Sequence, residues 1–200
     1  MSNDLANVHP SSQAASGPSG IPSAHMRQST AAKAGHEHEP ISRQYLTFNT
    51  SGECYALGIL SIKEIIEFGN ITKVPLVPLF VRGVINLRGA VVPVIDLSAR
   101  LYGHCISEGK RTCVVIVEIN TPDGLMELGI VVDAVNEVLE LSSTDLSQAP
   151  NFGSRIRTDF IEAMARINEK LVMVLALDKV LSIEEMSALV ALREQGATDL

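Results

Sequence analysis

The sequence predicts a mainly β protein made of small closed barrels, with one helix at the C-terminal end. From residue 42 onward, many short apolar runs follow one another, and turn-favouring residues separate them at close spacing. No long helical pattern interrupts these runs before residue 182. Many short strands with little helix between them are typical of closed β-barrels.

A tight hairpin is predicted around Arg88-Gly89, which separates two apolar runs, 84–87 and 90–95. A two-residue loop with glycine second suits the positive φ of a primed hairpin turn. In this register Leu87 faces Ala90 and Ile85 faces Val92. Both faces of the hairpin are then mostly apolar, so it should be packed on two sides, with Arg88 pointing outward.

Further strands are expected on both sides of this hairpin. Apolar runs of strand length place them at residues 44–49, 54–59, 71–74, 112–119, 125–133, 134–141, 160–167 and 171–177. The expected connections are turns at 50–52, 69–70, 121–124 and 168–170, one helical turn at 78–81, and a short helix at 98–102 that ends at Gly103. Residues 60–67 fit either a helical turn or a strand, because so short a run has no decisive period.

The C-terminal segment has the pattern of a capped helix. Ser182 and Glu185 fit a capping box, with acidic charge near the positive end of the helix dipole. Apolar residues follow at helical spacing, namely Ile183, Met186, Leu189 and Val190. We expect this stripe to pack on a barrel in preference to binding a partner, and Gly196 to close the helix.

Composition argues against nucleic acid as a partner. The 200 residues carry a formal charge of −7, contain no Trp and are only 4% aromatic. Binding to phosphate backbones needs clustered Lys and Arg, and binding to single-stranded bases needs aromatic platforms. The first residues lack the apolar core of a signal peptide, and no apolar run reaches the roughly 20 residues that span a bilayer. We therefore expect a cytoplasmic protein.

No metal, cofactor or catalytic set is recognisable. Cys54, Cys105 and Cys113 are odd in number and lack C-x-x-C spacing, so buried free thiols are expected. His104 is adjacent to Cys105, but a nucleophile and its base must converge within about 3 Å, which adjacency alone does not give. No nucleophile elbow, phosphate loop, dinucleotide fingerprint or metal-binding helix is present. We expect a protein without enzymatic activity.

Residues 1–41 are expected to form a disordered tail. Ser, Ala, Gly, Pro and His dominate this segment, which shows neither the helical nor the strand period. Such a composition buries too little apolar area to offset the entropy of ordering the chain. His36 and His38 should be solvated, because no further metal ligands accompany them.

The residues around the hairpin resemble the signature of the chemotaxis coupling protein family, CheW. The resemblance rests on Val74-Pro75, Pro78, residues 83–89 (Gly-Val-Ile-Asn-Leu-Arg-Gly) and residues 93–97 (Pro-Val-Ile-Asp-Leu). It continues at 129–133 and 174–181. It implies two small five-stranded SH3-like β-barrels that share a core over residues 42–186, with 187–200 as the end of the C-terminal helix and a tail.

The same resemblance implies a function. Members of the family are adaptors that join the cytoplasmic signalling domains of chemoreceptors to the histidine kinase CheA at membrane receptor arrays. The receptor tip docks in an apolar groove between the barrels, and the kinase regulatory domain binds a barrel end. By position, Ile62, Glu64 and Arg88 match residues at or beside the receptor groove. The kinase-binding residues are not identified.

Purely structural roles for the same residues are also considered. Glu64 and Arg88 could form an exposed ion pair worth at most about 1 kcal/mol. Gly83, Asn86 and Gly89 are expected to shape the turn. Ala163 stands where the family usually has glycine, which implies a changed local backbone if that glycine has positive φ.

Two other functional classes are left open by the sequence. One is a related adaptor that serves another receptor–kinase array, such as one controlling surface motility. The other is a ligand-binding or nucleic-acid-binding barrel unrelated to signalling. The acidic charge and the few aromatic residues weigh against the second class.

Deleting residues 1–40 should leave the melting temperature within about one or two degrees of the full-length value, because the tail buries little surface. Thermal unfolding followed by circular dichroism checks this. A large fall in the melting temperature would show that the tail docks on the fold.

Overall fold

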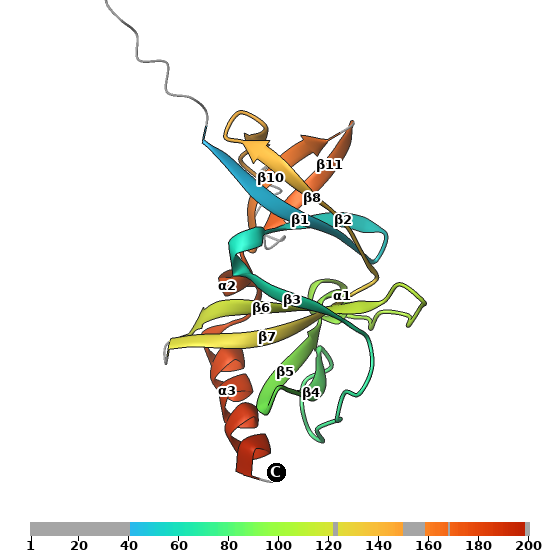
Figure 1. Ribbon diagram of the computed structural model, residues 1–200, viewed down its shortest axis with the longest axis vertical. Coiled ribbons are helices and arrows are strands. Elements are labelled where there is room, and N and C mark those ends of the chain that lie inside the picture. The colour runs from blue at the N-terminus through green and yellow to red at the C-terminus, as the bar shows by residue number, and fades with distance from the viewer. Residues whose placement is uncertain (1–40, 122–123, 150–158, 168, 199–200) are drawn as a thin grey trace, which may run out of the picture. The chain divides into compact units, whose positions relative to one another are not determined.

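Two β-sheets and a C-terminal helix make up the described part of the computed structural model, which comprises residues 41–121, 124–149, 159–167 and 169–198 (Figure 1). The predicted mainly β fold class is confirmed. Some sequence predictions lie outside the described residues. They are the tail over 1–40, with His36 and His38, and the turn residues Pro122, Asp123 and Asn168.

The first sheet has six strands in the order β8-β1-β2-β11-β10-β9. Their bounds are β1 Ser42–Thr50, β2 Glu53–Gly58, β8 Ala134–Ser142, β9 Leu146–Ser147, β10 Ile161–Ile167 and β11 Lys170–Leu175. Neighbouring strands are antiparallel except β11 and β2, which are parallel. The short β9 adds a sixth strand to the five that were expected.

The second sheet has five strands in the order β3-β6-β7-β5-β4. Their bounds are β3 Ile62–Glu67, β4 Val81–Leu87, β5 Ala90–Asp96, β6 Cys113–Thr121 and β7 Gly124–Val132. Strands β5 and β7 are parallel and the other neighbours are antiparallel. The central position of β7 therefore joins the β4–β5 hairpin to the β3–β6 pair.

Helices lie between and after the strands. Their bounds are the 3-10 helix η1 Ile59–Ser61, α1 Leu97–Tyr102, α2 Leu177–Val180 and α3 Ile183–Thr198. Gly103 closes α1 with φ 79, as predicted. The capping box is also confirmed, because the Ser182 N–H donates to Glu185 Oε2 at 2.7 Å and the Glu185 N–H donates to Ser182 Oγ at 3.2 Å. Helix α3 runs through Gly196 to Thr198, which corrects the predicted end. A glycine inside a helix costs only about 1 kcal/mol.

The segment before the hairpin also differs from the sequence prediction. The ambiguous run 60–67 divides into the end of η1 and all of β3. Residues 71–74 form no strand, since Thr72 alone makes a bridge, to Val84. Residues 78–81 form a turn closed by a 2.9 Å hydrogen bond from the Val81 N–H to the Pro78 carbonyl, without a helix. The two prolines at 75 and 78 lack N–H donors, which limits ladder formation here.

The hairpin of β4 and β5 has the predicted register around its two-residue turn. All residues of β5 from Val91 to Asp96 are buried. Val92 and Val94 pack in a cluster within the second sheet, whereas Ile95 packs in the main core. The predicted burial of the hairpin on two sides is therefore confirmed.

The main core joins the two sheets. It contains Phe48 and Leu57 from the first sheet, Val115 and Leu128 from the second, and Leu189 from α3, each at most 1% exposed. One apolar cluster thus takes side chains from both sheets, as the expected shared core requires. Helix α3 lies along β5 (Figure 1), and its residues Met186, Leu189 and Val190 pack in the main core.

Asp96 links β4, β5, α1 and the loop that follows α1. Its carboxylate is fully buried. Asp96 caps α1, because its Oδ1 accepts a 3.0 Å hydrogen bond from the Ala99 N–H. Its Oδ2 accepts from the Ile106 N–H, also at 3.0 Å, and lies 3.6 Å from Nη1 of Arg82 on β4. Every acceptor oxygen of this buried carboxylate therefore has a partner.

Replacing Asp96 with alanine should lower the free energy of unfolding by about 2 to 4 kcal/mol, because two backbone N–H groups lose their acceptors. Asp96→Asn is the matched control and should lose less, since its amide oxygen still caps α1. Urea denaturation measures both variants. Equal stability of Asp96→Ala and the wild type would contradict this role.

Candidate functional site

The turn at Arg88-Gly89 carries the first group of predicted site residues. Arg88 and Gly89 have φ values of 55 and 88, which are the two positive values that a type I′ turn needs. The Gly89 N–H donates to Asn86 Oδ1 at 2.9 Å. The Arg88 side chain is 80% exposed, so the turn presents its guanidinium to solvent.

Glu64 on β3 reaches this turn from the other edge of the second sheet. Its Oε2 lies 3.0 Å from Nη2 of Arg88, and its side chain is 27% exposed. Ile62 begins the same strand and is half-buried against the main core. The structure therefore brings Glu64 and Arg88 into an ion pair, with Ile62 two residues earlier on β3.

Gly83 lies within β4, before the turn residues. Its φ is 137, and a Cβ built on it would lie 2.0 Å from the Thr72 carbonyl oxygen. Thr72 and Val84 exchange two backbone hydrogen bonds of 2.8 and 2.9 Å at this point. Glycine is required here because another backbone segment approaches closely.

Ala163 stands at an irregular position of β10. The register between β10 and β11 shifts between Ile161 and Ala163. Ala163 is not among the residues with positive φ, so its backbone is accessible to any L-residue. The local irregularity is accommodated without the conformation that would demand glycine.

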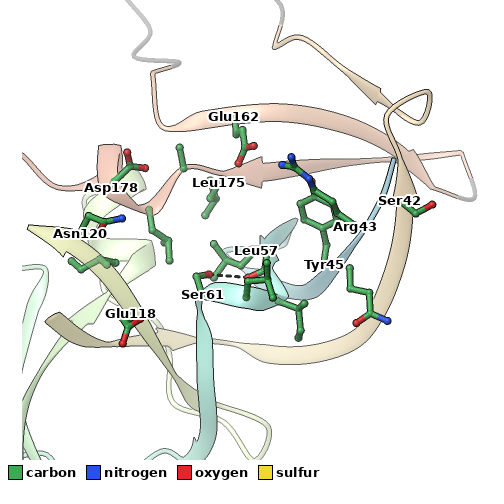
Figure 2. A pocket seen from close by; sticks show the side chains of 17 residues that line it. Ser42, Arg43, Tyr45, Leu57, Ser61, Glu118, Asn120, Glu162, Leu175 and Asp178 are labelled. Atoms are coloured by element: carbon green, nitrogen blue, oxygen red, sulfur yellow. Dashed lines mark hydrogen bonds between the residues drawn. The ribbon is translucent and has the colours of Figure 1, made fainter. Parts of the chain in front are cut away.

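A cleft of about 720 Å³ lies between the two sheets (Figure 2). Its floor consists of buried side chains, namely Tyr45, Leu57, Ile119, Leu175 and Leu177. Leu60 of η1 also lines it and is 98% exposed. Leu60 therefore adds apolar surface at the rim of the cleft, above the buried floor.

The cleft opens next to the strand that carries Glu64. Its lining includes Ser61, whose hydroxyl donates to the Gly58 carbonyl at 2.8 Å and closes η1. Strand β3 begins at the next residue, Ile62. A ligand that fills the cleft and extends along β3 would therefore reach the Glu64–Arg88 pair.

Charged side chains frame the cleft. Arg43, Glu118, Glu162 and Asp178 all line it. Glu118 on β6 forms a 2.7 Å ion pair with Lys63, and the hydrogen bond that this carboxylate accepts from the ammonium raises the pKa of Lys63. The remaining charges come from β1, β10 and α2, and Figure 2 shows Glu162 and Asp178 across the cleft from Glu118.

The other sequence candidates lead to no reactive centre. The three cysteines are free, as predicted, but half-buried, and burial raises the pKa of the Cys54 and Cys113 thiols. His104 Nε2 lies 3.2 Å from Ser51 Oγ on an exposed surface. Within the described ranges, no group of three or more His, Cys, Asp or Glu is placed to hold a metal ion. No helix among the described residues has the length and apolar character needed to span a bilayer.

Comparison with known proteins identifies the family. The model of the CheW-like domain matches residues 44–185. The chain belongs to the CheW family. It is 32% identical over 149 residues to the chemotaxis protein CheW of Klebsiella aerogenes, covering 74% of this chain and 87% of that protein. It is 31% identical over 147 residues to the chemotaxis protein CheW of Thermotoga maritima, covering 72% of this chain and 89% of that protein.

A solved structure agrees with this assignment. The crystal structure of the scaffolding protein TtCheW from Thermoanaerobacter tengcongensis matches with a TM-score of 0.65 and 31% identity. The match covers 78% of this chain and 99% of the TtCheW chain. Both the sequence and the fold of this chain are therefore those of a CheW protein.

The cleft itself was not predicted residue by residue. Its walls come from segments as far apart in the sequence as Arg43 and Asp178, and no local pattern joins them. The exposure of Leu60 could not be predicted either, because Leu60 lies in the run 60–67, for which the sequence allowed both helix and strand. Within the candidate site, only the Arg88-Gly89 turn could be predicted from local sequence.

Gly83→Ala should lower the free energy of unfolding by about 2 to 4 kcal/mol, because the new methyl group meets the Thr72 carbonyl. Gly58→Ala is the matched control, since its Cβ meets nothing within 4 Å and its φ is negative. The control should change stability by less than about 1 kcal/mol. Urea denaturation compares the two variants, and equal losses would contradict the close-approach explanation.

Proposed function

We propose that this CheW protein is a non-enzymatic adaptor that couples the cytoplasmic signalling domains of chemoreceptors to the histidine kinase CheA. The main support is the family match over residues 44–185, together with an apolar cleft between the two sheets. An adaptor needs docking surfaces and no chemistry of its own. The cleft and the exposed Glu64–Arg88 pair support this proposal as surfaces that a partner can reach.

The receptor tip is assigned to the cleft and to the edge of β3. Exposed Leu60 and half-buried Ile59 offer apolar contact to a helical hairpin at the rim of the cleft, above the floor of buried side chains. Glu64 and Arg88 then meet polar groups of the receptor beside the cleft, while Ile62 supports the start of β3. Arg88 contributes most when its guanidinium meets a receptor carboxylate, because charge-assisted hydrogen bonds are the stronger ones.

The kinase regulatory domain is assigned to a barrel end, separate from the receptor surface. The adaptor domain is residues 42–186, and binding to both partners would recruit the cytoplasmic protein to membrane receptor arrays. In this proposal neither nucleic acid nor insertion into the membrane takes part.

Arg88→Ala should weaken receptor binding by about 1 to 3 kcal/mol while kinase binding persists. The same change should alter the free energy of unfolding by no more than about 0.5 kcal/mol, because the Arg88 side chain is exposed. Arginine and alanine both carry a Cβ, so the strain of the positive φ at this position stays the same. Calorimetric titrations with the receptor signalling domain and with the kinase, plus a melting curve, check the three quantities.

Arg166→Ala provides a control with the same change in charge, because Arg166 is exposed on β10 of the first sheet. Its receptor affinity should equal that of the wild type. Wild-type receptor affinity in a folded Arg88→Ala protein would reject the site. Failure of the unmodified chain to bind either partner would reject the adaptor function.

A further inference from the structure

Two carboxylates on one wall of the cleft have no cationic partner among the residues that the structure describes. Glu162 projects from β10 and Asp178 from the first turn of α2, and both side chains are exposed (Figure 2). Neither forms an ion pair with any residue that the structure describes. Their charges are therefore available to a ligand in the cleft.

The opposite wall is electrostatically different. Glu118 is already paired with Lys63 at 2.7 Å, so its charge is compensated within the fold. Arg43, at the start of β1, is the cation among the cleft-lining residues, and Figure 2 shows it on the same side of the cleft as Glu162. With Arg43 counted, this side carries two carboxylates and one cation, so its charge balance is negative.

An occupant has to satisfy both the floor and this wall. The floor is apolar and buried, so a bound segment displaces water from the space around the carboxylates. A carboxylate that loses water without gaining a partner is costly. Lys and Arg side chains meet both demands, because their stems cover apolar surface while their charged ends reach a carboxylate.

We propose that the cleft selects an apolar helical segment of the receptor that carries a Lys or Arg side chain against Glu162 and Asp178. This inference rests on the proposed function, since it names the chemistry of the segment that the adaptor accepts. The apolar side chains of Ile59 and Leu60 at the cleft supply contact area common to many helices. The acidic wall discriminates among them, because charge complementarity acts chiefly on specificity and association rate.

The test is a calorimetric titration of the full chain with the receptor cytoplasmic signalling domain at low and at high ionic strength. The variant Glu162→Gln with Asp178→Asn removes both charges and keeps the side-chain shapes. The control, Glu53→Gln with Glu140→Gln, removes two exposed carboxylates of the first sheet that do not line the cleft. A melting curve for each variant verifies folding.

We expect the cleft variant to bind roughly fivefold to tenfold more weakly than the wild type at low ionic strength, and the difference to shrink at high ionic strength. The control should bind like the wild type. Equal affinity of the two double variants would overturn the proposal while leaving receptor coupling intact. A loss that is unchanged by salt would also overturn it. Absence of wild-type binding would overturn the coupling function and this inference together.

Discussion

The fold depends on the burial of β5 on both of its faces. Val92 and Val94 pack inside the second sheet, while Ile95 packs in the core that joins the two sheets. Full burial of each aliphatic side chain stabilises the fold by about 1.5 to 3 kcal/mol. A shift of this strand would therefore weaken two clusters at once, so the relative position of the sheets is tied to the position of the hairpin.

This constraint separates the framework from the exposed groups of the candidate site. The buried part of the hairpin ends at Asp96, whose carboxylate fixes the start of α1. The other end of the hairpin is the turn, where Arg88 is exposed and bonded only to Glu64 among the described residues. The cleft likewise has a buried floor and a charged, exposed frame. Substitution of these exposed side chains should therefore change the stability of the fold little.

Sequence reasoning succeeded where the determinants are local. The register of the hairpin follows from a two-residue turn and the strand period, and the Ser182–Glu185 capping box from a fixed spacing of three. It failed where a distant segment decides. The run 71–74 has strand-like composition but makes a single bridge, and the reason for Gly83 is the approach of Thr72, which only the fold reveals.

The candidate site shows the same division. The family resemblance supplied the positions of Ile62, Glu64 and Arg88, and the structure shows that two of them form an ion pair. The cleft and its acidic wall could not be predicted, because their charge balance depends on side chains brought together from the whole domain. Burial of Leu57 and exposure of Leu60 are tertiary facts, although the two residues are close in sequence.

The central claim is that one chain holds two partners at once on separate surfaces. Sedimentation velocity of a mixture of this chain, the receptor signalling domain and the kinase tests it most directly. The account predicts a complex that contains all three proteins, larger than either binary complex, and no comparable association of receptor and kinase when this chain is omitted. Two binary complexes that exclude each other would contradict it.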